Sequence, residues 1–220
     1  MLRACFVVLA VALITACGDD DGSSNNTPGP DPTGRPAIAL DVSSGEPDPL
    51  VPGAYTSRVF APAPTFTVNE GWAASVVDTQ LIALIRDVQS DSDCLCIIAP
   101  DGVYDGATGT TIPLPVDLTE WFAANPGLVV TKPSSLQVGN RAARQMEVRV
   151  AEGAALQDGR LPLVAAAEHT YSLAPGEKGH IVIINHPDGP LVLGIRAPAA
   201  EYGDYFRRVE GVVGSLTFAD

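Results

Sequence analysis

The sequence predicts an α+β fold, a single domain with a central antiparallel β-sheet flanked by a few helices. Two observations favour it. Most of the chain after residue 53 consists of short β-branched and aromatic runs that end in turn residues. In residues 142–150, Met146 and Val148 alternate with Gln145 and Glu147, as expected for a strand with one buried and one wet face. Only two segments show helical spacing of their apolar residues.

Strands are expected along the whole predicted domain. Two of them flank the stretch Pro187-Asp188-Gly189-Pro190, which predicts a hairpin because proline presets the first turn angle and glycine accepts a positive φ. The expected strands are residues 55–60, 65–68, 81–86, 94–99, 142–150, 180–186, 191–197 and 215–218.

The first expected helix begins after Asp117, which is typical of an N-cap and has Glu120 in the capping-box position. Trp121 lies on its apolar face, and the helix should end at residues 125–127, Asn-Pro-Gly. The second helix is expected within residues 199–213, where aromatic residues and valines recur at helical spacing. Its internal glycines each cost about 1 kcal/mol relative to alanine.

The first 16 residues are typical of an export signal, because Arg3 precedes an apolar run that is too short to cross a bilayer. Residues 14–17, Ile-Thr-Ala-Cys, resemble the bacterial lipobox, in which small residues precede a cysteine that becomes the lipidated N-terminus. The resemblance implies that Cys17 is lipidated. An ordinary cleaved signal, cut after residues 10–12, is the alternative, but it leaves Cys17 unexplained.

Residues 17–53 are expected to be the lipidated cysteine and a disordered tether. The stretch 18–36 is rich in Asp, Gly, Ser, Asn and Pro, and it cannot bury enough apolar surface to offset the entropy of ordering. The three aspartates at 19–21 are interpreted as solvated tether charges, not as a metal site. The folded domain should then comprise residues 54–220, and a chain that starts near Ala54 should be about as stable as the mature protein.

The composition limits the partners. The chain carries 26 acidic and 13 basic residues, a formal charge of -13. This charge disfavours binding to nucleic acid and direct adhesion to anionic lipid, since both require a basic face. A monomer without cofactor is expected, attached by its lipid to the extracytoplasmic side of a bacterial envelope membrane, with the inner or outer membrane left open.

Three stretches together resemble a known fold family. They are residues 55–68 leading into Gly71-Trp72, the segment around residues 139–143, and a C-terminal helix that runs into residues 214–218. Their arrangement resembles the PsbP-like domain found in LpqN-type and uncharacterised bacterial lipoproteins. The resemblance implies a central antiparallel sheet with packed helices. It implies little about activity, because members of this fold are accessory and binding proteins with different partners.

No local motif of a hydrolase, zinc enzyme or phosphate-binding loop occurs in the sequence, so no catalytic or metal-binding residue is predicted. The histidines, His169, His180 and His186, are interpreted as surface or turn residues. The loop acids are interpreted as solvated, because the EF-hand pattern is missing. A calcium site is the alternative. These acids are Asp91, Asp93, Asp101 and Asp105.

Aromatic residues are candidates for a ligand cleft between the sheet and the helices. Trp72, Trp121, Tyr202 and Phe206 are predicted to line it, together with the neighbouring Phe122 and Tyr205. The alternative is that these residues form ordinary core.

Cys94 and Cys96 are the thiols that remain once Cys5 leaves with the signal and Cys17 takes the lipid. In a regular strand their Cα atoms are about 6.5–7 Å apart, at the edge of disulfide geometry. A disulfide between them therefore requires a turn or bulge at Leu95. Our hypothesis is a strained local disulfide with a structural role, and reactive free thiols are the alternative.

Three functions are compatible with these features. The first is a membrane-anchored, non-enzymatic binding or accessory module for an envelope protein or an apolar ligand. The second is a structural or stress-related surface lipoprotein without a small ligand, and the third is an envelope hydrolase with a non-local site. The predicted anchor and the absence of catalytic motifs favour the first.

The anchor gives the first testable prediction. Replacing Cys17 with serine should release the protein from the membrane fraction or block its processing, because the covalent lipid supplies the membrane attachment. Cell fractionation and intact-mass measurement check this. Normal processing and membrane retention of Cys17→Ser would contradict lipidation at this residue.

Overall fold

The computed structural model describes residues 36–41, 46–86 and 93–219. The predicted signal peptide, Cys17 and residues 18–35 lie outside the described residues. Within the described part there are two helices, and neither is long and apolar enough to cross a membrane.

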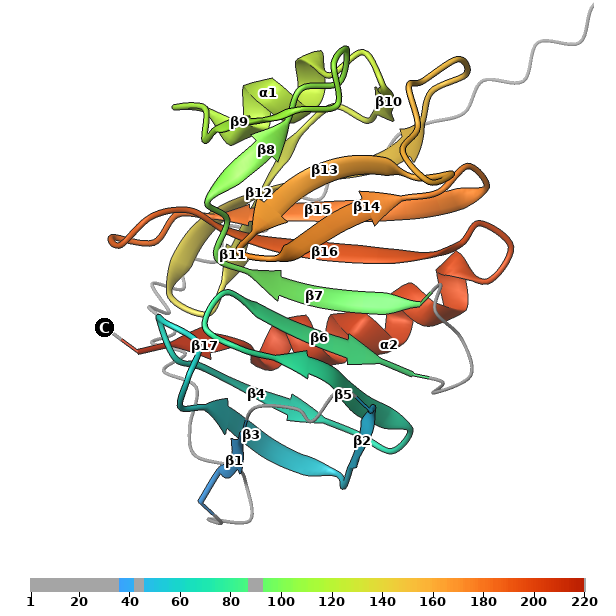
Figure 1. The fold of residues 1–220 in the computed structure, drawn as a ribbon. Coiled ribbons are helices and arrows are strands. Elements are labelled where there is room, and N and C mark those ends of the chain that lie inside the picture. Colours follow the sequence, from blue (N-terminus) through green and yellow to red (C-terminus); the bar gives the residue numbers. More distant parts are fainter. Residues whose placement is uncertain (1–35, 42–45, 87–92, 220) are drawn as a thin grey trace, which may run out of the picture.

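A nine-stranded sheet is the centre of the fold (Figure 1). Eight strands lie in the order β10-β12-β15-β16-β7-β6-β5-β2, and β11 also pairs with β12. Each of these pairings is antiparallel, which confirms the predicted central antiparallel sheet. The strands are β2 (Asp48–Leu50), β5 (Trp72–Val77), β6 (Leu81–Ile85), β7 (Cys94–Ile98), β10 (Leu128–Val130), β11 (Ser134–Val138), β12 (Arg141–Val150), β15 (Glu177–Ile184) and β16 (Leu191–Pro198).

One face of the central sheet is covered by a second sheet and the first helix. The second sheet has the order β14-β13-β8-β9, and it lies with α1 in the upper part of Figure 1. Its side chains and those of α1 share one apolar core with the central sheet. The elements are β8 (Gly102–Tyr104), β9 (Thr111–Pro113), α1 (Leu118–Ala124), β13 (Leu161–Ala166) and β14 (His169–Leu173).

The opposite face is covered by the second helix and a third sheet. Helix α2 (Tyr202–Ser215) passes behind β6 and β7 in Figure 1. The third sheet has the order β1-β3-β4-β17, and its residues and those of α2 form a separate core with the central sheet. Its strands are β1 (Ile38–Leu40), β3 (Gly53–Ser57), β4 (Pro64–Val68) and β17 (Thr217–Phe218).

Because both faces of the central sheet are covered, its middle strands are apolar without alternation. All five residues of β7 are buried. Cys94 and Cys96 belong to the core on the α1 side, whereas Leu95 and Ile97 belong to the core on the α2 side. This double burial explains why β6 and β7 appear in the sequence as continuous apolar runs.

The local predictions for turns and caps are confirmed. The side chain of Asp117 caps α1 by accepting a hydrogen bond from the Glu120 amide at 2.9 Å. Strands β15 and β16 form the predicted hairpin, and Gly189 in the turn has a φ of 131°. The expectation of flanking helices is only partly right, because strands make up most of both covering layers.

The predicted domain boundary at residue 54 is corrected by the structure. Strand β1 pairs in parallel with β3, and β2 pairs in an antiparallel manner with β5. Leu40 and Leu50 are both buried in the core on the α2 side. The domain therefore includes residues from 36 onward, within the segment that its polar and proline-rich composition had suggested to be tether.

This correction changes the expected effect of truncation. A chain that begins at Ala54 should lose about 3–6 kcal/mol of folding free energy relative to one that begins at Pro36, because burying each leucine contributes about 1.5–3 kcal/mol. Urea unfolding of the two chains measures the difference. Equal midpoints and slopes would show that β1 and β2 do not stabilise the domain.

Candidate functional site

A groove lies between α2 and the central sheet, and we call it the His180 groove. It has a volume of about 230 Å³. Strands β11, β12, β15 and β16 form one wall, and α2 forms the other. Its lining residues are Leu136, Gln137, Gln145, His180, Val182, Ile195, Phe206, Val209, Glu210, Val213 and Gly214.

The way α2 packs produces the apolar wall. The helix buries a stripe that includes Tyr205, Val209 and Val212 against the core. Phe206 and Val213 lie at the margin of this stripe and are only partly buried. They extend the apolar surface of the helix beyond its contact with the sheet, which leaves an apolar groove instead of a closed interface.

His180 is the central polar group of the groove. It lies on β15 and is only 8% exposed. Its Nε2 is 3.0 Å from Oε1 of Gln145 on the neighbouring strand, and its ring centroid is 4.8 Å from that of Phe206. Its Nδ1 is buried and has no hydrogen-bond partner among the described residues. A buried polar atom without a partner carries a desolvation cost, so this nitrogen is suited to bonding with a ligand.

The environment keeps His180 neutral. Burial lowers the pKa of His180 below its usual 6.5, the charge of Lys178 lowers it further, and Glu147 opposes both. With the imidazole neutral, Nε2 donates to the Gln145 carbonyl oxygen, and Nδ1 is left as an acceptor. The groove therefore offers apolar walls and one buried hydrogen-bond acceptor.

Polar and aromatic contacts fix the residues beside the groove. Lys178 Nζ forms an ion pair with Glu147 at 2.7 Å and lies 4.5 Å from the centroid of the Tyr202 ring. Tyr202 in turn stacks on Phe206, with ring centroids 5.5 Å apart. Phe206 is thus held between Tyr202 and His180, which preforms one side of the groove.

The aromatic residues predicted to line one cleft are divided between the two faces of the sheet. Tyr202 and Phe206 lie at or beside the His180 groove, while Trp72 packs against Tyr205 in the core of the same face. Trp121 is on α1, which packs on the opposite face, so it cannot contribute to this groove. Helical spacing within each helix does not indicate which face of a sheet the helix covers.

Cys94 and Cys96 do not form the hypothesised disulfide in this structure. Both are buried free thiols, and β7 pairs with β6 and β16 in continuous register through Leu95. The bulge that a disulfide needs is therefore missing from β7. Instead, the two thiols lie on the same side of the strand in the core shared with the second sheet.

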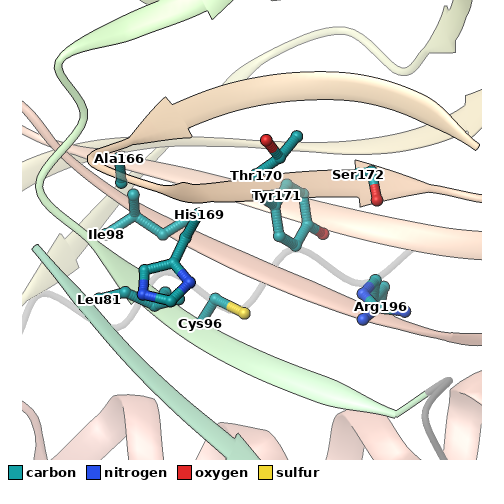
Figure 2. Close-up of a pocket in the computed structure, with 9 residues that line it drawn as sticks. All are labelled: Leu81, Cys96, Ile98, Ala166, His169, Thr170, Tyr171, Ser172 and Arg196. Carbon is teal, nitrogen blue, oxygen red and sulfur yellow. The ribbon is translucent and has the colours of Figure 1, made fainter. Parts of the chain in front are cut away.

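A small recess of about 50 Å³ reaches Cys96, and we call it the Cys96 recess (Figure 2). His169 from β14 lies over Cys96 in Figure 2, and Tyr171 and Arg196 lie further along. Gly194 gives Tyr171 room here, because a Cβ on Gly194 would be 2.5 Å from the Tyr171 ring. The Tyr171 hydroxyl donates to the carbonyl oxygen of Ile195 at 3.2 Å.

Charged groups surround the two thiols. Arg196 pairs in register with Cys94, and its Nη1 is 3.3 Å from Oε1 of the buried Glu177. The other oxygen of Glu177 accepts from Nη2 of Arg160 at 2.7 Å. The hydrogen bond with Cys96 lowers the pKa of Cys94, with help from Arg196 and Arg160, and the same bond raises the pKa of Cys96.

The histidines and loop acids considered in the sequence analysis have separate partners in the structure. His169 Nε2 is 2.6 Å from Asp78 Oδ2, while His186 lies near Asp188 in the hairpin turn. Asp101 accepts the Ala167 amide at 3.0 Å, which gives it a loop-stabilising role. Among residues 36–41, 46–86 and 93–219, no three His, Cys, Asp or Glu residues are grouped to hold a metal.

The remaining acids of that set do not form a calcium site either. Asp105 accepts the amides of Ala107 and Thr108, which lowers its pKa. Asp93 is buried, and Asp91 lies outside the described residues. The described acids therefore serve their own loops or are buried separately.

Comparisons of sequence and of structure with known proteins give different results. No family model and no curated protein sequence matches this chain. The solution structure of cyanobacterial PsbP (CyanoP) from Synechocystis sp. PCC 6803 is similar to it with a TM-score of 0.43 and 9% identity. The match covers 77% of this chain and 95% of that one.

The pKa of His180 predicts how stability depends on pH. The folded pKa lies below the unfolded value near 6.5, so the unfolded chain takes up more protons between these two values. The stability linked to His180 is present above pH 6.5 and declines as the pH falls toward the folded pKa. His180→Phe should therefore lose less stability than the wild type between pH 7.5 and 5, measured by urea unfolding. His169→Phe serves as the comparison, and equal pH dependence of wild type and His180→Phe would contradict the prediction.

Proposed function

We propose that this protein is a membrane-anchored extracytoplasmic lipoprotein that acts as a non-enzymatic binding module for a small, uncharged, apolar ligand. The single observation that carries the proposal is the His180 groove, an apolar groove with one buried acceptor that has no partner in the described chain. Binding sites for small molecules combine these two features, apolar walls and a few convergent polar groups.

The size and chemistry of the groove define the ligand class. A volume of about 230 Å³ is smaller than a typical drug-sized pocket, so the groove fits an aromatic ring or a short length of acyl chain. The free Nδ1 of His180 is an acceptor, so the ligand should carry a hydroxyl or N–H donor beside its apolar part. Glu210 in the lining and the overall charge of -13 disfavour an anionic ligand.

The sequence supports the location of this activity. The lipobox-like residues 14–17 and the tether composition of residues 18–35 favour a domain held near a membrane surface. The proposal also keeps the resemblance to LpqN-type PsbP-like lipoproteins, in which this fold carries accessory and binding roles. A structural lipoprotein without a ligand is the alternative that the following experiment distinguishes.

The test uses N-phenyl-1-naphthylamine, a neutral fluorescent probe with an apolar ring system and one N–H donor. The wild-type protein should bind it saturably with one probe per chain. Val213→Trp should abolish binding, because the larger side chain fills the groove from the margin of α2. His180→Phe should weaken binding about fivefold, the effect of one lost hydrogen bond.

Matched controls separate the groove from unspecific apolar contact. Val129→Trp places the same side chain on the exposed part of β10 and should leave binding unchanged. The N-methylated probe lacks the donor, so wild type and His180→Phe should bind it equally. Unchanged binding by a folded Val213→Trp variant, or no saturable binding by the wild type, would refute the proposal and favour the structural alternative.

A further inference from the structure

The two ring nitrogens of His180 have different environments in the His180 groove. Nε2 lies 3.0 Å from Oε1 of Gln145, whereas Nδ1 is buried and has no hydrogen-bond partner among the described residues. The Gln145 oxygen can only accept a hydrogen bond, so Nε2 carries a proton in both charge states of the ring. Nδ1 is therefore the atom that gains or loses the titrating proton, and it is also the atom left for a ligand.

A ligand and a proton compete for this nitrogen. In a neutral imidazole, Nδ1 has one lone pair, which can accept a hydrogen bond from a donor on the ligand. Protonation uses that lone pair and turns Nδ1 into a donor, so the donor of the ligand then meets a second hydrogen. The contact that the proposed function assigns to Nδ1 therefore exists only while His180 is neutral.

The packing around the ring prevents His180 from avoiding this competition. The residue is only 8% exposed, and its ring centroid is 4.8 Å from that of Phe206, which itself stacks on Tyr202. Turning the imidazole over would bring ring carbons to the positions of both nitrogens. That change would break the contact with Gln145 and bury a second polar atom without a partner, so the observed orientation is favoured.

Three of the elements that pack around His180 carry charged or titratable groups. Glu147 of β12 lies opposite it in the β12–β15 register, and Lys178 of β15 forms an ion pair with that carboxylate at 2.7 Å. Helix α2 contributes Glu210 and the neighbouring Tyr202, whose hydroxyl has a pKa raised by burial and stays protonated. Strands β11 and β16 contribute uncharged residues to the groove. Among the described lining residues, Glu210 is therefore the other group that can gain a proton in mild acid.

An apolar ligand adds to the cost of protonating His180. Burial already lowers the pKa of His180 below its usual 6.5 in the ligand-free protein. A ligand in the groove excludes the remaining water from Nδ1, and an imidazolium beneath an apolar surface is a buried charge without a partner. Both the lost hydrogen bond and the buried charge therefore act against binding to the protonated form.

We propose that the His180 groove releases its ligand in acid, because protonation of His180 at Nδ1 removes the acceptor that holds the ligand. This inference rests on the proposed function and adds its regulation, since each bound ligand excludes one proton. The affinity is complete above the pKa of His180 and declines as the pH falls through it. Linkage makes the effect reciprocal, so a bound ligand also keeps His180 neutral.

The test uses N-phenyl-1-naphthylamine and the full chain with Cys17→Ser. That substitution removes the predicted lipidation site, so attached acyl chains cannot fill the groove. The probe is a diarylamine, which takes up no proton between pH 7.5 and 5. The pKa of His180 is measured on the same protein by NMR of the imidazole nitrogens. The affinity should be constant above this pKa and about five- to tenfold lower one pH unit below it.

Variants assign the pH dependence to one nitrogen. His180→Gln keeps a donor toward Gln145 and an acceptor toward the ligand, but an amide does not titrate. This variant should bind the probe at pH 7.5 and lose no affinity in acid. His169→Gln removes a histidine outside the groove, and Glu210→Gln removes the other titratable group of the lining. Both variants should keep the wild-type pH dependence.

A second measurement needs no substitution at His180. Saturating probe should raise the acid dissociation constant of His180 at least about tenfold, because the ligand and the proton exclude each other by the same factor. The nitrogen spectra should also show Nε2 protonated and Nδ1 unprotonated in the neutral ring. This measurement decides the question even where His180→Gln fails to fold.

The outcomes separate this inference from the proposed function. A protein without saturable binding at pH 7.5 would refute both. Saturable binding at pH 7.5 with an affinity that does not change through the pKa of His180 would overturn only the acid release. The same holds for a folded protein in which His180 stays neutral down to pH 5, for a His180→Gln variant with the wild-type pH dependence, and for an acid dissociation constant that the probe leaves unchanged. Loss of the pH dependence in Glu210→Gln would also overturn the acid release.

Discussion

The structure depends on the burial of both faces of its central sheet. Each strand in the middle of the sheet presents side chains to two separate cores, one shared with the second sheet and α1, the other with α2 and the third sheet. Any polar group on these strands must therefore find a partner inside the protein, because water cannot reach it. The polar residues that occur there are concentrated at the two sites described above. Glu177 and Arg196 are paired with each other, whereas Nδ1 of His180 has no partner among the described residues.

The two sites arise from this constraint in different ways. The His180 groove exists because α2 covers its face with a stripe narrower than the apolar surface of the helix, so Phe206 and Val213 remain at the margin. The Cys96 recess exists because the second sheet brings polar side chains over β7. Beside it, the buried Glu177 forms ion pairs with Arg160 and Arg196. In the first site a buried acceptor has no partner among the described residues, and in the second the buried Glu177 pairs with two arginines.

Periodicity and turn chemistry in the sequence were sufficient for part of this fold. The capped helix after Asp117 and the hairpin that turns at Gly189 depend on neighbouring residues, so their signals are local and can be recognised in the sequence. Strand β13 was missed because all of its residues are buried and it contains proline and alanines, which gives no alternation. Strands β1 and β2 were missed because they are three residues long and lie in a polar, proline-rich segment.

The sites were harder to predict than the elements. The cysteines were singled out by residue type, whereas His180 was interpreted as a surface or turn residue and is in fact buried on β15. The partners of both come from distant strands. Gln145 meets His180 across the β12–β15 pairing, and Arg196 meets Cys94 across the β16–β7 pairing. A single sequence contains no signal for such pairings until the register is known, because the partners are separated by 35 residues or more.

Strand β16 connects the two sites physically. Ile195 lines the His180 groove, and the next residue, Arg196, lines the Cys96 recess, because successive side chains of a strand point to opposite faces. The strand is paired along its length with β15 and, through Arg196, with β7. A strand fixed on both sides cannot shift toward one site without breaking pairings at the other. The same packing therefore holds the two sites on opposite faces of one fixed strand.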